Sequence, residues 1–130
     1  MDINLPDVVA EVTAAFQRYE QALVSNNVDE LDAMFRDDPR TIRYGASENL
    51  YGYGEIKAFR AGRSPVALGR TLSKTVITTY GRDFAVASTL YDRPSAKGRV
   101  GRQMQTWVRF PDGWRVVAAH VSLMDAPKTG

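Results

Sequence analysis

Apolar residues in the first part of the chain recur at intervals of three and four, the spacing of one face of a helix. This stripe consists of Val9, Val12, Phe16, Tyr19 and Leu23. Pro6 suits the first turn of a helix, so one long helix is predicted from there to Ser25. A second helix is predicted after Asn27, which can cap it, with an apolar face that includes Leu31 and Phe35.

The pattern changes after residue 40. Residues 41–44 are partly β-branched and predict a short strand, and residues 55–60 have a helical composition that ends at Gly62. Four longer stretches rich in Val, Thr, Tyr and Trp predict strands at residues 72–80, 84–91, 100–110 and 114–124. Turn signals separate these strands, the strongest being Pro111-Asp112-Gly113.

Helices gathered early and antiparallel strands gathered late predict a fold of the α+β class. We expect residues 1–130 to form a single domain in which a curved antiparallel sheet wraps around the N-terminal helices. Such a cone has one open mouth, where the first helix, the first strand and the last strands converge. This arrangement would bring Tyr19 towards Arg43.

The formal net charge of the 130 residues is only +2, but the charges are distributed unevenly. Residues 1–39 carry nine acidic and two basic side chains, whereas residues 40–130 carry six acidic and fifteen basic ones. No nucleic-acid-binding motif accompanies the basic excess, so a small anionic ligand is the better match. No apolar stretch reaches the ~20 residues of a membrane span, and the N-terminus lacks a secretory signal, so we expect a cytoplasmic protein.

Residues 40–63 concentrate the basic side chains. They alternate there with Tyr44, Tyr51 and Tyr53, against only two acids, Glu48 and Glu55. We interpret this stretch as one wall of a small-molecule site, with residues 45–54 as its rim or lid. A solvated basic face with a few buried tyrosines is the alternative, because runs of charge are often simply exposed.

Conventional catalytic motifs are missing from the sequence. It contains no cysteine and a single histidine, His120, so a zinc cluster of the usual ligands is not expected. Motifs for dinucleotides, nucleoside triphosphates and serine hydrolases are also missing. We therefore expect polar catalysis without a cofactor and without a metal.

Tyr19 and Arg43 are the candidate catalytic residues. Tyr19 lies on an apolar stripe, where its hydroxyl needs a hydrogen-bond partner if buried, and it is either a structural core tyrosine with one such bond or part of the site. Arg43 lies in the middle of a strand, and inside a cavity its guanidinium would need an anion. That anion is either Glu48, in a purely structural pair, or a substrate carboxylate held by two parallel hydrogen bonds.

Five further side chains are candidates for binding the substrate. They are Glu48, Arg60, Arg63, His120 and Ser122. The two arginines lie three residues apart, which suits one side of a helix. Regular alternation along the last strand would put the histidine and the serine on one face with Trp114 and Val116. Gln103 and Gln105 share a face with Trp107, either as cavity lining or as exposed residues.

Two segments of the chain resemble a known family. Residues 43–63, RYGASENLYGYGEIKAFRAGR, and residues 101–122, GRQMQTWVRFPDGWRVVAAHVS, are similar to the AtzH-like family. This family belongs to the NTF2-like superfamily, together with ketosteroid isomerase and the SnoaL-like cyclases. The resemblance covers most of the chain and implies the cone-shaped α+β fold.

The resemblance also implies an activity, that of a cofactor-independent decarboxylating amidohydrolase. Its substrate would be a small carboxylated urea, as in the conversion of 1,3-dicarboxyurea to allophanate in cyanuric acid and ureide nitrogen catabolism. The tyrosine and arginine of the family match Tyr19 and Arg43. The tyrosine would act as an acid towards nitrogen or as a base on water, and both roles stay open.

Two other functions also stay open. A non-catalytic accessory or binding subunit of a partner amidase would fit the lack of a conventional nucleophile. Another NTF2-like isomerase or cyclase would need an apolar cavity with a carboxyl group of raised pKa. Folds of this shape commonly pair through the exposed face of the sheet, so a homodimer or higher homo-oligomer is expected.

Overall fold

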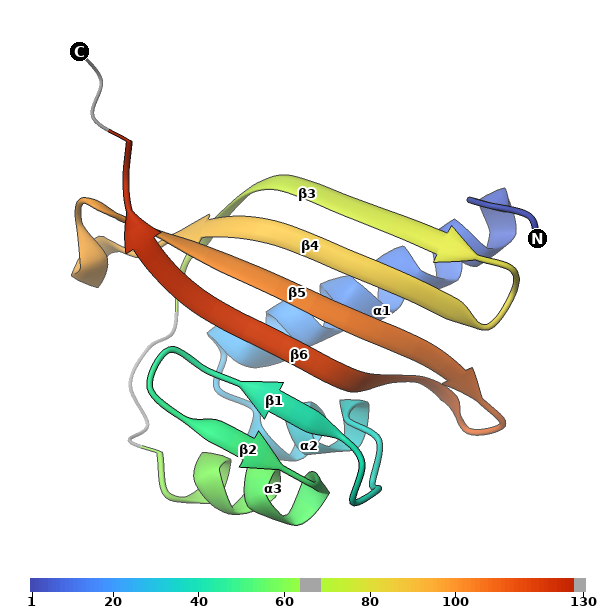
Figure 1. Cartoon of the computed structure of the whole chain (residues 1–130), viewed down its shortest axis with the longest axis horizontal. Coiled ribbons are helices and arrows are strands. Elements are labelled where there is room, and N and C mark those ends of the chain that lie inside the picture. Colours follow the sequence, from blue (N-terminus) through green and yellow to red (C-terminus); the bar gives the residue numbers. More distant parts are fainter. Residues whose placement is uncertain (64–68, 128–130) are drawn as a thin grey trace.

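The computed structural model describes residues 1–63 and 69–127 (Figure 1). Its helices are α1 (Pro6–Val24), α2 (Val28–Met34) and α3 (Tyr53–Ala61), with a short 3-10 turn at Pro94–Ala96. Its strands are β1 (Ile42–Tyr44), β2 (Asn49–Tyr51), β3 (Thr71–Tyr80), β4 (Phe84–Asp92), β5 (Arg99–Phe110) and β6 (Gly113–Asp125). The α+β class predicted from the order of the patterns is confirmed.

The strands form one six-stranded curved sheet in the order β2-β1-β6-β5-β4-β3. β1 runs parallel to β6, and the other neighbours are antiparallel. Figure 1 shows α1 lying across one face of the long strands, with α2 and α3 beside the β1–β2 end. We call the face towards α1 the inner face and the opposite one the outer face. Core residues such as Ala87, Trp107 and Ala119 mark the inner face.

The helix termini follow the signals in the sequence. Pro6 is the first residue of α1, and Asn27 caps α2 by accepting a 3.2 Å hydrogen bond from the backbone N–H of Glu30. The buried stripe of α1 begins at Val8 rather than Val9, and then continues as predicted. No helix of the described ranges is long and apolar enough to cross a membrane.

The segment expected to be a rim or lid contains a strand that was not predicted. β2 pairs with β1 through Arg43 opposite Leu50, and the backbone N–H of Gly45 donates to the carbonyl of Glu48 at 2.9 Å. Gly52 then adopts a φ of 90°, which favours glycine, and α3 begins at the next residue. A hairpin therefore fixes the residues between Arg43 and α3.

The long β5–β6 hairpin is irregular at one point. Trp107 pairs with Val116 and Thr106 pairs with Ala118, so β6 carries an extra residue between them. Because side chains alternate along a strand, each residue of β6 after the extra one faces the opposite side of the sheet from the side that regular pairing would give it. Ala119 is therefore buried and His120 exposed, and the predicted regular alternation from Val116 to His120 is wrong.

Candidate active site

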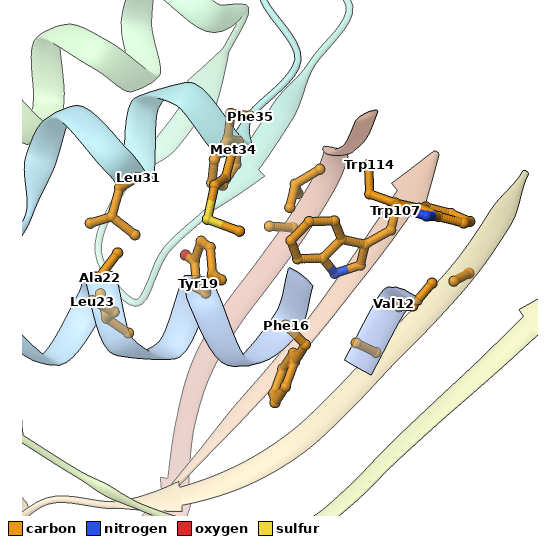
Figure 2. Close-up of a cluster of buried hydrophobic side chains, with 14 of the residues drawn as sticks. Val12, Phe16, Tyr19, Ala22, Leu23, Leu31, Met34, Phe35, Trp107 and Trp114 are labelled. Carbon is orange, nitrogen blue, oxygen red and sulfur yellow. The ribbon is translucent and has the colours of Figure 1, made fainter. Parts of the chain in front are cut away.

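Tyr19 projects from α1 into the core between the helices and the inner face of the sheet (Figure 2). Its ring lies edge-on to Trp107 with 6.4 Å between centroids, and 6.1 Å from the ring of Phe35. The residue is only 3% exposed, yet its hydroxyl forms no hydrogen bond with a residue in the described ranges. A phenol hydroxyl both donates and accepts, so this one can bond a ligand.

Arg43 faces the same side of the sheet as Tyr19. It lies opposite Ala119 in the parallel β1–β6 pair, and Ala119 belongs to the core. Its Nη1 donates to Oε1 of Glu48 at 2.8 Å, with 13% of the arginine side chain and 17% of the glutamate side chain exposed. The structural partner anticipated from the sequence is thus present. Since this bond uses one of five donors, the guanidinium can still bind a second acceptor.

Glu48 is held in place by its own turn. Ser47 donates to Oε2 from its backbone N–H at 3.3 Å and from its hydroxyl at 2.8 Å, and a side chain at Gly45 would collide with the carboxylate. Burial alone would raise the pKa of Glu48, but the hydrogen bonds from Ser47 and Arg43 outweigh it and hold that pKa below its usual value. Glu48 is therefore ionised and orients Arg43.

Arg60 lies on the buried side of α3 and is 4% exposed. Its Nη1 donates to Oδ1 of Asp32 at 2.9 Å, and its guanidinium carbon lies 4.4 Å from the ring centroid of Phe35. The Tyr53 hydroxyl donates to the backbone carbonyl of Asp32 at 3.0 Å. Nη2 of Arg60 is buried and has no hydrogen-bond partner in the part of the chain that the structure describes. Arg60 thus presents one free donor beside the Tyr19–Phe35 pair.

Arg70, which was not among the predicted site residues, connects α1 to the inner face of the sheet. It donates to both carboxylate oxygens of Glu20, at 3.0 Å and 2.6 Å, and to Oε1 of Gln103 at 3.0 Å. Its guanidinium carbon lies 4.6 Å from the ring centroid of Tyr91. Gln103 is 2% exposed and Gln105 is 1% exposed, so both amides face inward.

Arg63 and Arg93 have no acidic partner within residues 1–63 and 69–127. Nε and Nη2 of Arg63 and Nε of Arg93 are buried without hydrogen-bond partners among these residues. Burial lowers the pKa of Arg63, and repulsion from Arg60 and Arg43 lowers it further. Burial also lowers the pKa of Arg93, and repulsion from Arg70 adds to this effect while Tyr91 and Glu20 oppose it. These two guanidinium groups are the uncompensated charges of the site.

Five arginines therefore gather on the inner side of the cone, and we call them the arginine cluster. Its members are Arg43, Arg60, Arg63, Arg70 and Arg93. Three of them are paired with Glu48, Asp32 and Glu20. The described part of the site therefore has an excess of two positive charges, which a small dianion would neutralise.

Arg93 was not predicted as a site residue, because it stands in the turn signal Arg93-Pro94-Ser95. The period of the preceding strand could have identified it. Ala85, Ala87, Thr89 and Tyr91 are all buried, and a residue two positions further points to the same face.

His120 and Ser122 lie on the outer face of the sheet. His120 pairs with Tyr44 in register, the two rings are 6.0 Å apart, and the hydroxyl of Ser122 accepts a 3.2 Å hydrogen bond from Nε of Arg102. The expectation that they share a face with Trp114 and Val116 is corrected by the extra residue in β6. The structure brings Arg60 and Arg63 close to Tyr19 and Arg43, but not His120 and Ser122.

The sequence profile of the AtzH-like family matches residues 1–127 of this chain. The chain belongs to the AtzH-like family. The matched range includes all the residues that form the site, from Tyr19 on α1 to Gln103 on β5. No curated protein sequence matches the chain significantly.

Solved structures of related proteins have the same architecture. A protein of unknown function from Pectobacterium atrosepticum is 60% identical, over 95% of this chain and 96% of that one, with a TM-score of 0.93. A protein with a cystatin-like fold from Burkholderia xenovorans is 48% identical, over 98% and 99% of the two chains, also with a TM-score of 0.93. An NTF2-like protein from Pseudomonas putida is 19% identical, over 95% and 89%, with a TM-score of 0.77. The predicted NTF2-like cone is confirmed.

Proposed function

We propose that this AtzH-like protein is a cofactor-independent decarboxylating amidohydrolase that removes one carboxyl group from a small dicarboxylated urea. The conversion of 1,3-dicarboxyurea to allophanate is the reaction of this type. One observation carries the proposal: Arg63 and Arg93, two guanidinium groups without an acidic partner among the described residues, repel one another, and Arg63 also acts electrostatically on the buried Tyr19. Such an environment concentrates a dianion and offers it a proton donor.

Arg43 would orient the carboxylate that leaves. Because Glu48 already compensates part of its charge, Arg43 binds this carboxylate less strongly than an unpaired arginine would. Weaker binding of the departing carboxylate favours the reaction, since this group loses its charge when it becomes carbon dioxide. Interactions with the retained end of the substrate persist throughout, and hold the substrate in place.

Tyr19 would supply the proton. The C–N bond to the departing carboxylate breaks, its electron pair stays on nitrogen, and this nitrogen takes the proton of the Tyr19 hydroxyl. Carbon dioxide and allophanate leave, and water returns a proton to the tyrosinate, leaving a hydroxide ion that combines with the carbon dioxide as hydrogencarbonate. The Arg63 guanidinium, whose electrostatic neighbours include Tyr19, stabilises the tyrosinate while it exists.

The test is to incubate the protein with freshly prepared dicarboxyurea and follow carbon dioxide and allophanate. We expect turnover by the native chain, and a loss of about 100-fold or more in Tyr19→Phe and in Arg43→Ala, the size expected for a lost acid or a lost charged donor. Tyr44→Phe, which alters a phenol on the outer face, is the matched control and should keep the native rate.

Two outcomes would contradict the proposal. Folded Tyr19→Phe and Arg43→Ala variants with native rates would reject these residues as catalytic. Binding of the substrate without turnover would reject the reaction, and turnover that needs an added amidase would favour the accessory role.

A further inference from the structure

A second group of donors lies just beyond the end of β4 and on β5, outside the basic stretch at residues 40–63. Arg93 lies just after β4, two residues beyond Tyr91 and with an extended backbone, so both side chains point to the inner face. The guanidinium carbons of Arg70 and Arg93 lie 4.6 Å and 5.3 Å from the ring centroid of Tyr91. Two arginines therefore share one aromatic ring, but only Arg70 has an acidic partner among the described residues.

The amide of Gln103 is fixed in one orientation. Its Oε1 accepts a hydrogen bond from Nη2 of Arg70, which Glu20 in turn holds through two further bonds. A guanidinium has no acceptor, so turning the amide over would place donor against donor. Nε2 must therefore point away from Arg70, and it is buried without a partner among the residues that the structure describes.

Unpaired donors inside a protein carry a cost. A buried donor without an acceptor costs about 1–3 kcal/mol, and charged groups cost more. Gln103 and Arg93 both present such donors on the inner side of the cone. A ligand oxygen would remove this cost, and an anionic oxygen would also compensate the charge of Arg93.

We propose that Arg93 and Gln103 bind the carboxylate that the substrate retains, and so select dicarboxylated over monocarboxylated ureas. The inference rests on the proposed function, because it concerns the other end of the same substrate. Arg93 supplies the charge and Gln103 supplies a neutral donor of fixed direction. Arg63 is within electrostatic reach of both Arg43 and Arg93, which repel it.

Stable ligands test this inference without the reaction. Dicarboxyurea has three atoms between its two carboxyl carbons, and so does glutarate, which does not decarboxylate under these conditions. Glutaramate, the half-amide, has the same length and one charge fewer. Calorimetric affinities of both ligands, measured at one low ionic strength, give the preference for a second carboxylate as a ratio.

We expect the native protein to bind glutarate at least tenfold more tightly than glutaramate. Arg93→Met should reduce this ratio to within about threefold, because only one strong carboxylate site remains. Gln103→Glu should do the same, since the new carboxylate still accepts from Arg70 but presents no donor to the ligand. Arg102→Met is the matched control, because this neighbour of Gln103 is exposed on the outer face and should leave the ratio unchanged.

Unfolding midpoints separate binding from folding, because they show which variants keep the native fold. A native ratio near one, or a native ratio retained in both folded variants, would overturn the inference. The proposed function fails differently. A preference for glutarate that depends on Arg93, without turnover of dicarboxyurea, would reject the reaction and leave the dianion site standing.

Discussion

The arginine cluster inside the cone and the arginines on its surface differ in what surrounds their charge. Arg82 pairs with Asp7 at 2.9 Å, but both side chains are more than half exposed, at 58% and 59%. Arg60 pairs with Asp32 at the same distance with only 3% and 9% exposed. Water and salt screen the first pair, whereas the second must be compensated by protein groups. An enclosed arginine without an acid is therefore a better indicator of an anion site than a basic stretch of sequence.

The largest effect on stability is expected from removing an acid inside the cone. Asp32→Asn keeps the shape of the side chain but leaves Arg60 uncompensated beside Arg63. Breaking a buried pair in this way costs about 3–5 kcal/mol of unfolding free energy. Urea denaturation followed by circular dichroism would measure the loss.

The matched surface variant sharpens this contrast. Asp7→Asn breaks an ion pair of the same length at the exposed start of α1, and its urea midpoint should stay that of the native protein. Equal losses in Asp32→Asn and Asp7→Asn would show that enclosure does not distinguish the two sets of arginines.

Much of the cone could be predicted from local patterns. The apolar stripe of α1 identified Tyr19 as a buried residue. The capping signal at Asn27 correctly marked the start of α2, and the Pro-Asp-Gly signal correctly marked the turn between β5 and β6. These features depend on residues a few positions apart, so periodicity and turn chemistry are enough to find them. The same information placed Arg43 on a strand beside Glu48.

The remaining parts of the site depend on registers that a single sequence does not reveal. One extra residue in β6 moves His120 to the outer face, and no residue type marks the bulge in advance. The pairing of Arg70 with Glu20 joins residues 50 positions apart, and depends on where α1 crosses the sheet. The sequence therefore predicted which side chains of α1 are buried, but not which side chains face inward at the ends of the long strands.

A smaller effect on stability is expected from adding a side chain at Gly101, against the ring of Tyr91. Gly101 lies opposite Tyr91, and a side chain there would collide with the ring. Gly101→Ala should force Tyr91 to move, lower the unfolding free energy by about 1–3 kcal/mol, and weaken glutarate binding through Arg70 and Arg93. Thermal unfolding with and without glutarate would show both changes.

Gly54→Ala is the surface counterpart of that variant. Nothing lies within 4 Å of the position that its side chain would occupy, and the residue is in the first turn of α3. Alanine in a helix is favoured over glycine by about 0.5–1 kcal/mol, so this variant should be as stable as the native protein or slightly more so. Native behaviour of Gly101→Ala would show that the position of Tyr91 is not constrained by β5.

The smallest effect concerns the pH dependence of the Glu48–Arg43 pair. The pKa of Glu48 is below its usual value in the folded chain, so its pair stabilises the fold above the unfolded pKa of about 4.3. This contribution is lost as the pH falls through the folded value. Glu48→Gln should therefore be less stable than the native protein at pH 7, by about 1 kcal/mol or less, with the difference shrinking as the pH falls through the folded pKa of Glu48. Urea midpoints across this range would measure the difference between the variant and the native protein.

Asp7 is the surface comparison for Glu48, because its pKa is lowered chiefly by its exposed hydrogen bond to Arg82. Salt at 1 M, where the screening length is about 3 Å, should leave most of the Glu48 contribution in place. A difference for Glu48→Gln that grows as the pH falls would instead mean that Glu48 is protonated in the native state, and that Arg43 has no ionised partner.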